Sequence, residues 1–186
     1  MEKLFDFVRK YMELSAGDIA LIEKSNVVKS YKKDEIISNV RLGYFVLSGS
    51  ICAYYKSSDR SVITEFYLEG EPVLLPNQPG IEDNYFLKCL EPTTLAVSSL
   101  IEAERIAREF PRFERVCRRF AEEKLSYALA FSNKLKLLSP IERYEFLVDQ
   151  RPELLGRVPQ HLIASYLGIA PETLSRARKQ MGNTTC

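Results

Sequence analysis

The chain has 186 residues, of which 46% are hydrophobic and 27% charged, and its formal net charge is +1. This length and balance are typical of a globular protein with one or two domains. No apolar run reaches the ~18–20 residues that span a membrane, and the N-terminus mixes charged with apolar residues, unlike a signal peptide. We therefore expect a cytoplasmic protein without membrane contact.

The cysteines and the single histidine argue against a metal centre or an active site. Cys52, Cys89, Cys117 and Cys186 are widely separated, and no Cys-x-x-Cys pair occurs. Zinc and iron–sulfur sites need clustered ligands, so we expect reduced structural thiols, no metal and no cofactor. The sequence has no Ser/His/Asp set with plausible spacing and no glycine-rich phosphate loop, so we expect no enzymatic activity.

The charges are unevenly distributed along the chain. Residues 1–104 carry 11 Lys/Arg and 16 Asp/Glu, residues 105–136 carry 9 and 4, and residues 137–186 carry 6 and 5. The more basic second half favours an anionic partner. A solvated helix face explains the central basic run equally well.

The first 97 residues change from a helical to a strand pattern. Residues 2–14 predict an amphipathic helix, and Ser15 is a plausible cap for a second short helix over 17–25. Between residues 26 and 97, short runs rich in β-branched and aromatic residues alternate with turn-forming segments, which predicts an all-β barrel or a sandwich-like roll. Three prolines interrupt residues 70–83, so we expect a loop or short helix there and no central strand.

Two helices are expected next. Residues 98–110 predict a helix that ends at Pro111, and residues 112–138 predict one of roughly 40 Å at 1.5 Å per residue. The apolar stripe of the long helix is broad and comprises Phe113, Val116, Cys117, Phe120, Ala121, Leu125, Ala128, Phe131 and Leu135. A helix of this length suits pairing with a second copy as well as contact with the roll. The alternative is an ordinary core helix.

The C-terminal segment carries the clearest motif. Ser139-Pro140 with Glu142 is a helix start, and two further helical runs, over 160–167 and from Pro171, are joined by Leu-Gly-Ile. Gly168 suits the left-handed end of a helix, while Leu174 and Ala177 can pack the last helix on the one before it. This spacing predicts a helix-turn-helix, whose second helix enters a DNA major groove. An αα-corner without a nucleic-acid role is the alternative.

The order of these elements resembles the Crp/Fnr family, that is, the cyclic-AMP receptor protein and the fumarate–nitrate regulator. Residues 158–176 (VPQHLIASYLGIAPETLSR) are similar to the DNA-binding motif, residues 43–50 (GYFVLSGS) to a strand–turn segment of the roll, and residues 68–71 (LEGE) to the start of the ligand cassette. The resemblance implies an α+β chain of three parts: a cyclic-nucleotide-binding-like β-roll (1–110), a long dimerisation helix (111–138) and a helix-turn-helix domain (139–186). It also implies a homodimer that binds palindromic DNA and contacts RNA polymerase.

The ligand cassette departs from the family pattern, in which an arginine holds the cyclic phosphate. Pro-Val-Leu-Leu-Pro follows Gly70 and Glu71, and the position expected for the arginine falls near Asn84 and Tyr85. No basic residue lies between Arg60 and Lys88, so we expect no cyclic-AMP binding and an unknown effector or none. Haem binding stays an open alternative, although the roll has no histidine. The roll's aromatic residues could line an apolar pocket or simply form the core.

The resemblance also implies roles for individual residues at the DNA. Glu172, Ser175 and Arg176 are expected to contact bases, with Arg176 on guanine and Glu172 on cytosine. Gln160, His161, Thr173 and Lys179 are expected to contact phosphates, although His161 fits a solvent-exposed helix start equally well. The chain ends at GNTTC without the β-hairpin wing of many family members.

Two functions follow from these patterns. The first is a dimeric, sequence-specific transcription regulator that does not respond to cyclic AMP. The second is an adaptor module of the same fold, which senses a small ligand or a protein and does not bind DNA.

Overall fold

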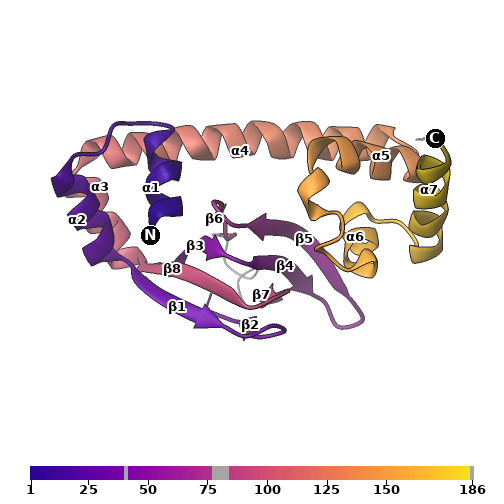
Figure 1. Cartoon of the computed structure of the whole chain (residues 1–186), viewed down its shortest axis with the longest axis horizontal. Coiled ribbons are helices and arrows are strands. Elements are labelled where there is room, and N and C mark those ends of the chain that lie inside the picture. The colour runs from indigo at the N-terminus through magenta and orange to yellow at the C-terminus, as the bar shows by residue number, and fades with distance from the viewer. Residues whose placement is uncertain (40–41, 77–83, 185–186) are drawn as a thin grey trace. The chain divides into compact units, whose positions relative to one another are not determined.

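The structure is a computed structural model that describes residues 1–39, 42–76 and 84–184 (Figure 1). The chain divides into two compact units, Met1–Glu122 and Glu123–Cys186. The boundary falls within the long helix. The predicted division at residues 110 and 138 stays a prediction.

The N-terminal unit begins with two short helices, α1 (Glu2–Arg9) and α2 (Ala16–Ser25). Ser15 and Asp18 form a capping box at the start of α2, which confirms the predicted cap. The first helix is shorter than predicted. Its last turn closes with hydrogen bonds from the amides of Tyr11 and Met12 to the carbonyl of Val8, after which the chain turns toward α2.

Within the residues that the structure describes, eight strands follow and form two antiparallel sheets. In chain order they are β1 (Val27–Tyr31), β2 (Ile36–Ile37), β3 (Leu42–Ser48), β4 (Ser50–Lys56), β5 (Ser61–Leu68), β6 (Pro72–Val73), β7 (Tyr85–Cys89) and β8 (Thr93–Ser99). One sheet has the order β1-β8-β3-β6 and the other β2-β7-β4-β5. A single buried cluster takes side chains from both, among them Val46, Ile51, Leu87 and Leu95, each 0% exposed. The predicted β-roll is therefore confirmed.

The proline-rich stretch contains one element that the sequence did not predict. Pro72 and Val73 form the two-residue strand β6, paired with Phe45 and Tyr44 of β3. This strand lies at the end of its sheet, where a proline without an N–H group is tolerated. Residues 77–83 lie outside the described residues. They include Glu82 and Asp83, two acidic residues of the ligand cassette just before the position expected for the arginine.

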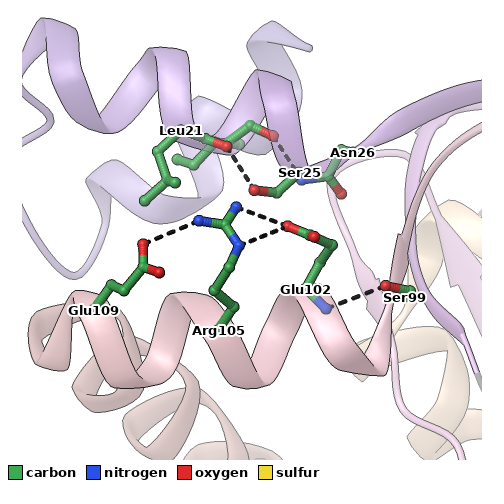
Figure 2. A network of polar contacts seen from close by, with 8 residues as sticks. Leu21, Ser25, Asn26, Ser99, Glu102, Arg105 and Glu109 are labelled. Carbon is green, nitrogen blue, oxygen red and sulfur yellow. Dashed lines mark hydrogen bonds and ion pairs between the residues drawn. The ribbon is translucent and has the colours of Figure 1, made fainter.

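Helices α3 (Leu100–Glu109) and α4 (Pro111–Leu137) follow the roll. Ser99 caps α3 by accepting a hydrogen bond from the amide of Glu102. Figure 2 shows Arg105 of α3 extending toward the last turn of α2, with Glu102 and Glu109 on either side of its guanidinium. Its shortest contacts are 2.7 Å to Glu102 and 3.0 Å to Glu109.

The apolar stripe of α4 separates into two faces. Phe113, Val116, Phe120 and Phe131 are buried. Phe113 joins the cluster of Phe5, Val8 and Ile22, while the ring of Phe120 lies 5.1 Å from that of Phe7. The exposed members of the stripe are Cys117, Ala121, Leu125 and Ala128. The N-terminal half of α4 thus packs on α1 and α2.

An ion pair between a buried aspartate and a partly exposed arginine connects α2 with α4. Asp18 is 1% exposed, accepts hydrogen bonds from the amide and hydroxyl of Ser15, and pairs with Arg112. Burial raises the pKa of Asp18, but the hydrogen bonds from Ser15 and Arg112 outweigh it and lower the pKa below its ordinary 3.8. The charged carboxylate therefore stabilises the fold at neutral pH.

We expect Arg112→Ala to lower the free energy of unfolding at pH 7 by about 1–2 kcal/mol, a value discounted because the arginine is partly exposed. The pKa of Asp18 is lower in the folded protein, so its contribution is present above pH 3.8 and is lost as the pH falls through the folded pKa. Urea unfolding at pH 7 and in acid measures both effects. Arg115→Ala, at an exposed position of the same helix, is the control; an equal loss in both variants would contradict the role of the ion pair.

The C-terminal unit contains the end of α4 and three further helices, α5 (Pro140–Gln150), α6 (Gln160–Leu167) and α7 (Pro171–Thr184), with a short 3-10 helix, η2 (Pro152–Leu154), after α5. Ser139 and Glu142 form the predicted capping box of α5. The core of this unit includes Leu147, Leu154, Leu167 and Leu174, each at most 1% exposed. The three helices predicted for this segment are confirmed.

Candidate nucleic-acid interface

The turn between α6 and α7 depends on Gly168. This glycine has φ 63° and ψ 37°, a left-handed conformation that other residues adopt only with strain. The amides of Gly168 and Ile169 donate hydrogen bonds to the carbonyls of Ser165 and Ala164, which closes the end of α6. The chain then enters α7 at Pro171 after only three residues outside the helices.

The inner faces of α6 and α7 are closely packed. Ile163, Ala164 and Leu167 of α6 and Leu174 and Ala177 of α7 are all at most 3% exposed. Leu174 and Ala177 are the two residues of the last helix that the sequence predicted for this contact. Two helices joined by a short glycine turn, with the second packed back on the first, form a helix-turn-helix.

Packing of Leu174 and Ala177 turns the opposite side of α7 to solvent. Glu172, Ser175, Arg176 and Lys179 are exposed, whereas Thr173 is half-buried. At the start of α6, Gln160 and His161 are also exposed. The structure thus makes six of the seven predicted DNA-contacting side chains accessible and partly covers the seventh.

A shallow hollow connects the two helices and includes a residue that the sequence analysis did not select. It has a volume of about 330 Å³ and is lined by Gln160, Ser175, Arg178 and Lys179. Arg178 also lines an adjoining hollow of about 420 Å³, together with Arg157 from the segment before α6. The helical spacing from Ser175 to Arg178 could have identified Arg178 in the sequence, because residues three apart share a helix face.

Arg143 of α5 holds the helix-turn-helix against the end of α4. Its Nε donates to the carbonyl of Leu138 at 3.1 Å, and its Nη1 donates to the carbonyl of Leu167 at 3.3 Å. Each of these carbonyls lies at the C-terminal end of a helix, where it has no partner within that helix. Arg143 therefore positions the C-terminal end of α6.

The residues of the degenerate cassette have structural contacts. Gly70 has φ 88°, and the carboxylate of Glu71 accepts a hydrogen bond of 2.8 Å from the amide of Leu68. Tyr85 is 8% exposed, accepts a hydrogen bond from Thr64 at 3.0 Å and has a pKa raised by burial. Asn84 is exposed. Glu71 thus stabilises a turn, and Tyr85 is part of the core of the roll.

Two negative observations concern the same described residues. Within them, no group of three or more His, Cys, Asp or Glu side chains is placed to hold a metal ion. None of the helices that the structure describes has the length and apolar character needed to cross a membrane.

Comparisons with known proteins point to transcription regulators. No protein-family model matches the chain. A transcriptional regulatory protein, btr, of Bordetella pertussis is 25% identical over 98% of this chain and 75% of its own length. The solved structure of FixK2 from Bradyrhizobium japonicum is similar with a TM-score of 0.74, 24% identity and 86% of each chain covered.

A third similar protein carries a family designation. It is a structure from Eubacterium rectale assigned to the transcriptional regulators of the Crp/Fnr family, with a TM-score of 0.67 and 15% identity over 94% of this chain and 88% of that one. The TM-scores of 0.74 and 0.67 establish the shared fold. The similarity extends over both units of the chain.

Proposed function

The chain has the fold of the Crp/Fnr transcription regulators, and on that premise we propose that it is a sequence-specific DNA-binding regulator that acts as a homodimer on a palindromic site. One observation carries the proposal: α7 follows a left-handed turn, packs on α6 through Leu174 and Ala177, and exposes Glu172, Ser175 and Arg176. This is the side of a recognition helix that reads base edges in the major groove.

The charges around this face support contact with the DNA backbone. Arg178 and Lys179 lie with Gln160 around one hollow, and His161 adds an exposed polar side chain at the start of α6. Basic and amide side chains that flank a recognition helix bind phosphates and set its register. We assign Arg178 to the phosphate-contacting group with Gln160, His161, Thr173 and Lys179.

The proposed dimer interface is the part of the exposed apolar face of α4 that runs from Ala121 to Leu129. Leu125 and Leu129 are 61% and 57% exposed, and Ala121 and Ala128 extend the same stripe. Apolar residues at this three- and four-residue spacing form the seam of a two-helix coiled coil. A two-fold pair sets its two recognition helices one helical turn of DNA apart, about 34 Å, which requires a palindromic site.

DNA binding is tested by selecting fragments from a random-sequence library and titrating the selected fragment against a shuffled one. We propose that the selected sequence is palindromic and binds at least ~10³-fold more tightly at physiological salt. The logarithm of the binding constant should fall linearly with the logarithm of salt concentration. Equal affinity for the two fragments would reject the regulator and favour the adaptor module.

We further propose that cyclic AMP does not regulate the protein. The stretch from Ser61 to Leu87 contains no lysine or arginine, and Glu71 caps the amide of Leu68 within its own turn. A cyclic phosphate without a fixed cation lacks its strongest partner. We expect no binding heat in calorimetry and no shift in thermal unfolding with cyclic AMP. A saturable response at micromolar ligand would refute this.

A further inference from the structure

A cavity lies in the N-terminal unit, outside the core of the roll. It has a volume of about 380 Å³ and lies between the helices α1, α2, α3 and α4 on one side and the outer face of the sheet that contains β3 and β8 on the other. Its walls are predominantly apolar and include Phe7, Val8, Phe45, Ala96, Ile106 and Phe113. This volume is within the range of small-molecule sites, which are mostly apolar with a few polar groups.

The cavity exists because the outer face of two strands carries small residues. Tyr44 and Val97 point into the core of the roll, so their neighbours Gly43, Ala96 and Ser98 point the other way, toward the cavity. A Cβ atom at position 43 would lie 2.6 Å from the hydroxyl oxygen of Ser98. A side chain at position 43 would therefore require Ser98 to change its rotamer, and with glycine there the space above the strand stays open.

The polar groups around the cavity restrict the kind of molecule that fits. Asn26 and Ser98 provide uncharged hydrogen-bonding groups, and the Nδ2 of Asn26 already donates to the carbonyl of Ile22 at 2.8 Å. Glu114 provides a carboxylate, while none of the described lining residues is a lysine or arginine. An anion would meet the like charge of Glu114 without a cation to compensate.

We propose that this cavity binds an uncharged, mainly apolar small molecule of about two or three rings, with a single hydrogen-bonding group directed to Asn26 or Ser98. The fit rests on the volume, the apolar walls, the uncharged polar groups and the carboxylate of Glu114. It does not depend on DNA binding. It also differs from the roll interior, which is filled by Tyr44, Tyr67 and their neighbours.

A matched pair of fluorescent probes tests the charge requirement in the full chain. N-phenyl-1-naphthylamine is neutral, and 8-anilinonaphthalene-1-sulfonate has the same ring skeleton with one negative charge. We expect the neutral probe to saturate at one site per chain and the anionic probe to bind roughly tenfold more weakly. Glu114→Gln should narrow that difference. Equal binding of the two probes to the unaltered protein would overturn the proposed ligand class.

Two Ala→Leu variants locate the site. Ala96 is 1% exposed and lines the cavity, so Ala96→Leu fills it and should weaken binding of the neutral probe at least tenfold. Ala20 is exposed on α2 and does not line the cavity, so Ala20→Leu should leave binding unchanged. Unchanged binding in a folded Ala96→Leu protein would exclude this cavity as the probe's site.

Cys117 gives a second measurement that leaves the cavity unaltered. It lines the cavity and keeps part of its surface exposed to solvent. Partial desolvation of the thiol, followed by the nearby charge of Glu114, raises its pKa. Cys52 and Cys89 are buried, so in a Cys186→Ser background Cys117 is the thiol expected to react with a maleimide at mildly alkaline pH. The neutral probe should slow this reaction at least fivefold at saturation. An unchanged rate would overturn the proposal, even if Ala96→Leu fails to fold.

Discussion

Replacement of Arg176 by alanine is expected to abolish sequence-specific DNA binding while the protein stays folded and dimeric. In the proposed complex, the guanidinium would fork onto O6 and N7 of one guanine, a contact that contributes about 1–3 kcal/mol of discrimination. A homodimer makes the contact twice, so the loss on a palindromic site is about 2–6 kcal/mol. Arg176 is exposed and is not part of the core of the C-terminal unit, so its removal leaves the fold intact.

The measurement is fluorescence anisotropy of a selected fragment and a shuffled fragment at several salt concentrations. In the Arg176→Ala protein, the two affinities should converge. Lys179→Ala is the matched control, because loss of a phosphate contact weakens binding to both fragments alike and reduces the salt dependence. A specificity ratio that survives Arg176→Ala would show that other residues read the bases.

The double replacement Leu125→Asp and Leu129→Asp is expected to convert the dimer into monomers. Both leucines are more than half exposed in the single chain, so aspartate is accommodated there without loss of core packing. In the paired helices, the same carboxylates would be buried in an apolar seam and face a second copy, which is strongly unfavourable. Affinity for the palindrome should fall by at least ~100-fold, because one chain binds only one half-site.

Analytical ultracentrifugation measures the change in mass, and circular dichroism checks that the helices remain. Leu137→Asp is the matched control: this leucine is 82% exposed on the same helix but lies about a third of a turn away from Leu125 at 3.6 residues per turn. The Leu137→Asp protein should remain dimeric. A double variant that still sediments as a dimer would place the interface elsewhere on the chain.

Local sequence signals were sufficient for most of the secondary structure. Ser139, Pro140 and Glu142 mark the start of α5, and the position of Gly168 between two apolar runs marks the turn of the helix-turn-helix. These features are read within a few residues, since caps and left-handed turns depend on neighbouring backbone groups. The buried faces of α6 and α7 were predicted for the same reason, from their helical spacing alone.

The tertiary structure decided what depends on residues far apart in sequence. Asp18 and Arg112 are 94 residues apart, and Arg143 reaches the carbonyl of Leu167 across 24 residues. No local pattern identifies such partners, because a charged side chain pairs with whatever the fold brings near it. The stripe of α4 was visible in the sequence, but which members of its N-terminal half are buried depends on where α1 and α2 lie.

The cavity of the N-terminal unit also depends on residues that are far apart in sequence. Gly43, Ala96 and Ser98 are unremarkable small residues in two strands, and only the pairing of β3 with β8 brings them together beneath Phe7 and Phe113. The sequence by itself thus determined the order of the elements and the outward side chains of the recognition helix, because both follow from short-range periodicity. Only the tertiary structure decided the long-range ion pairs and the cavity, because these arise where separate elements meet.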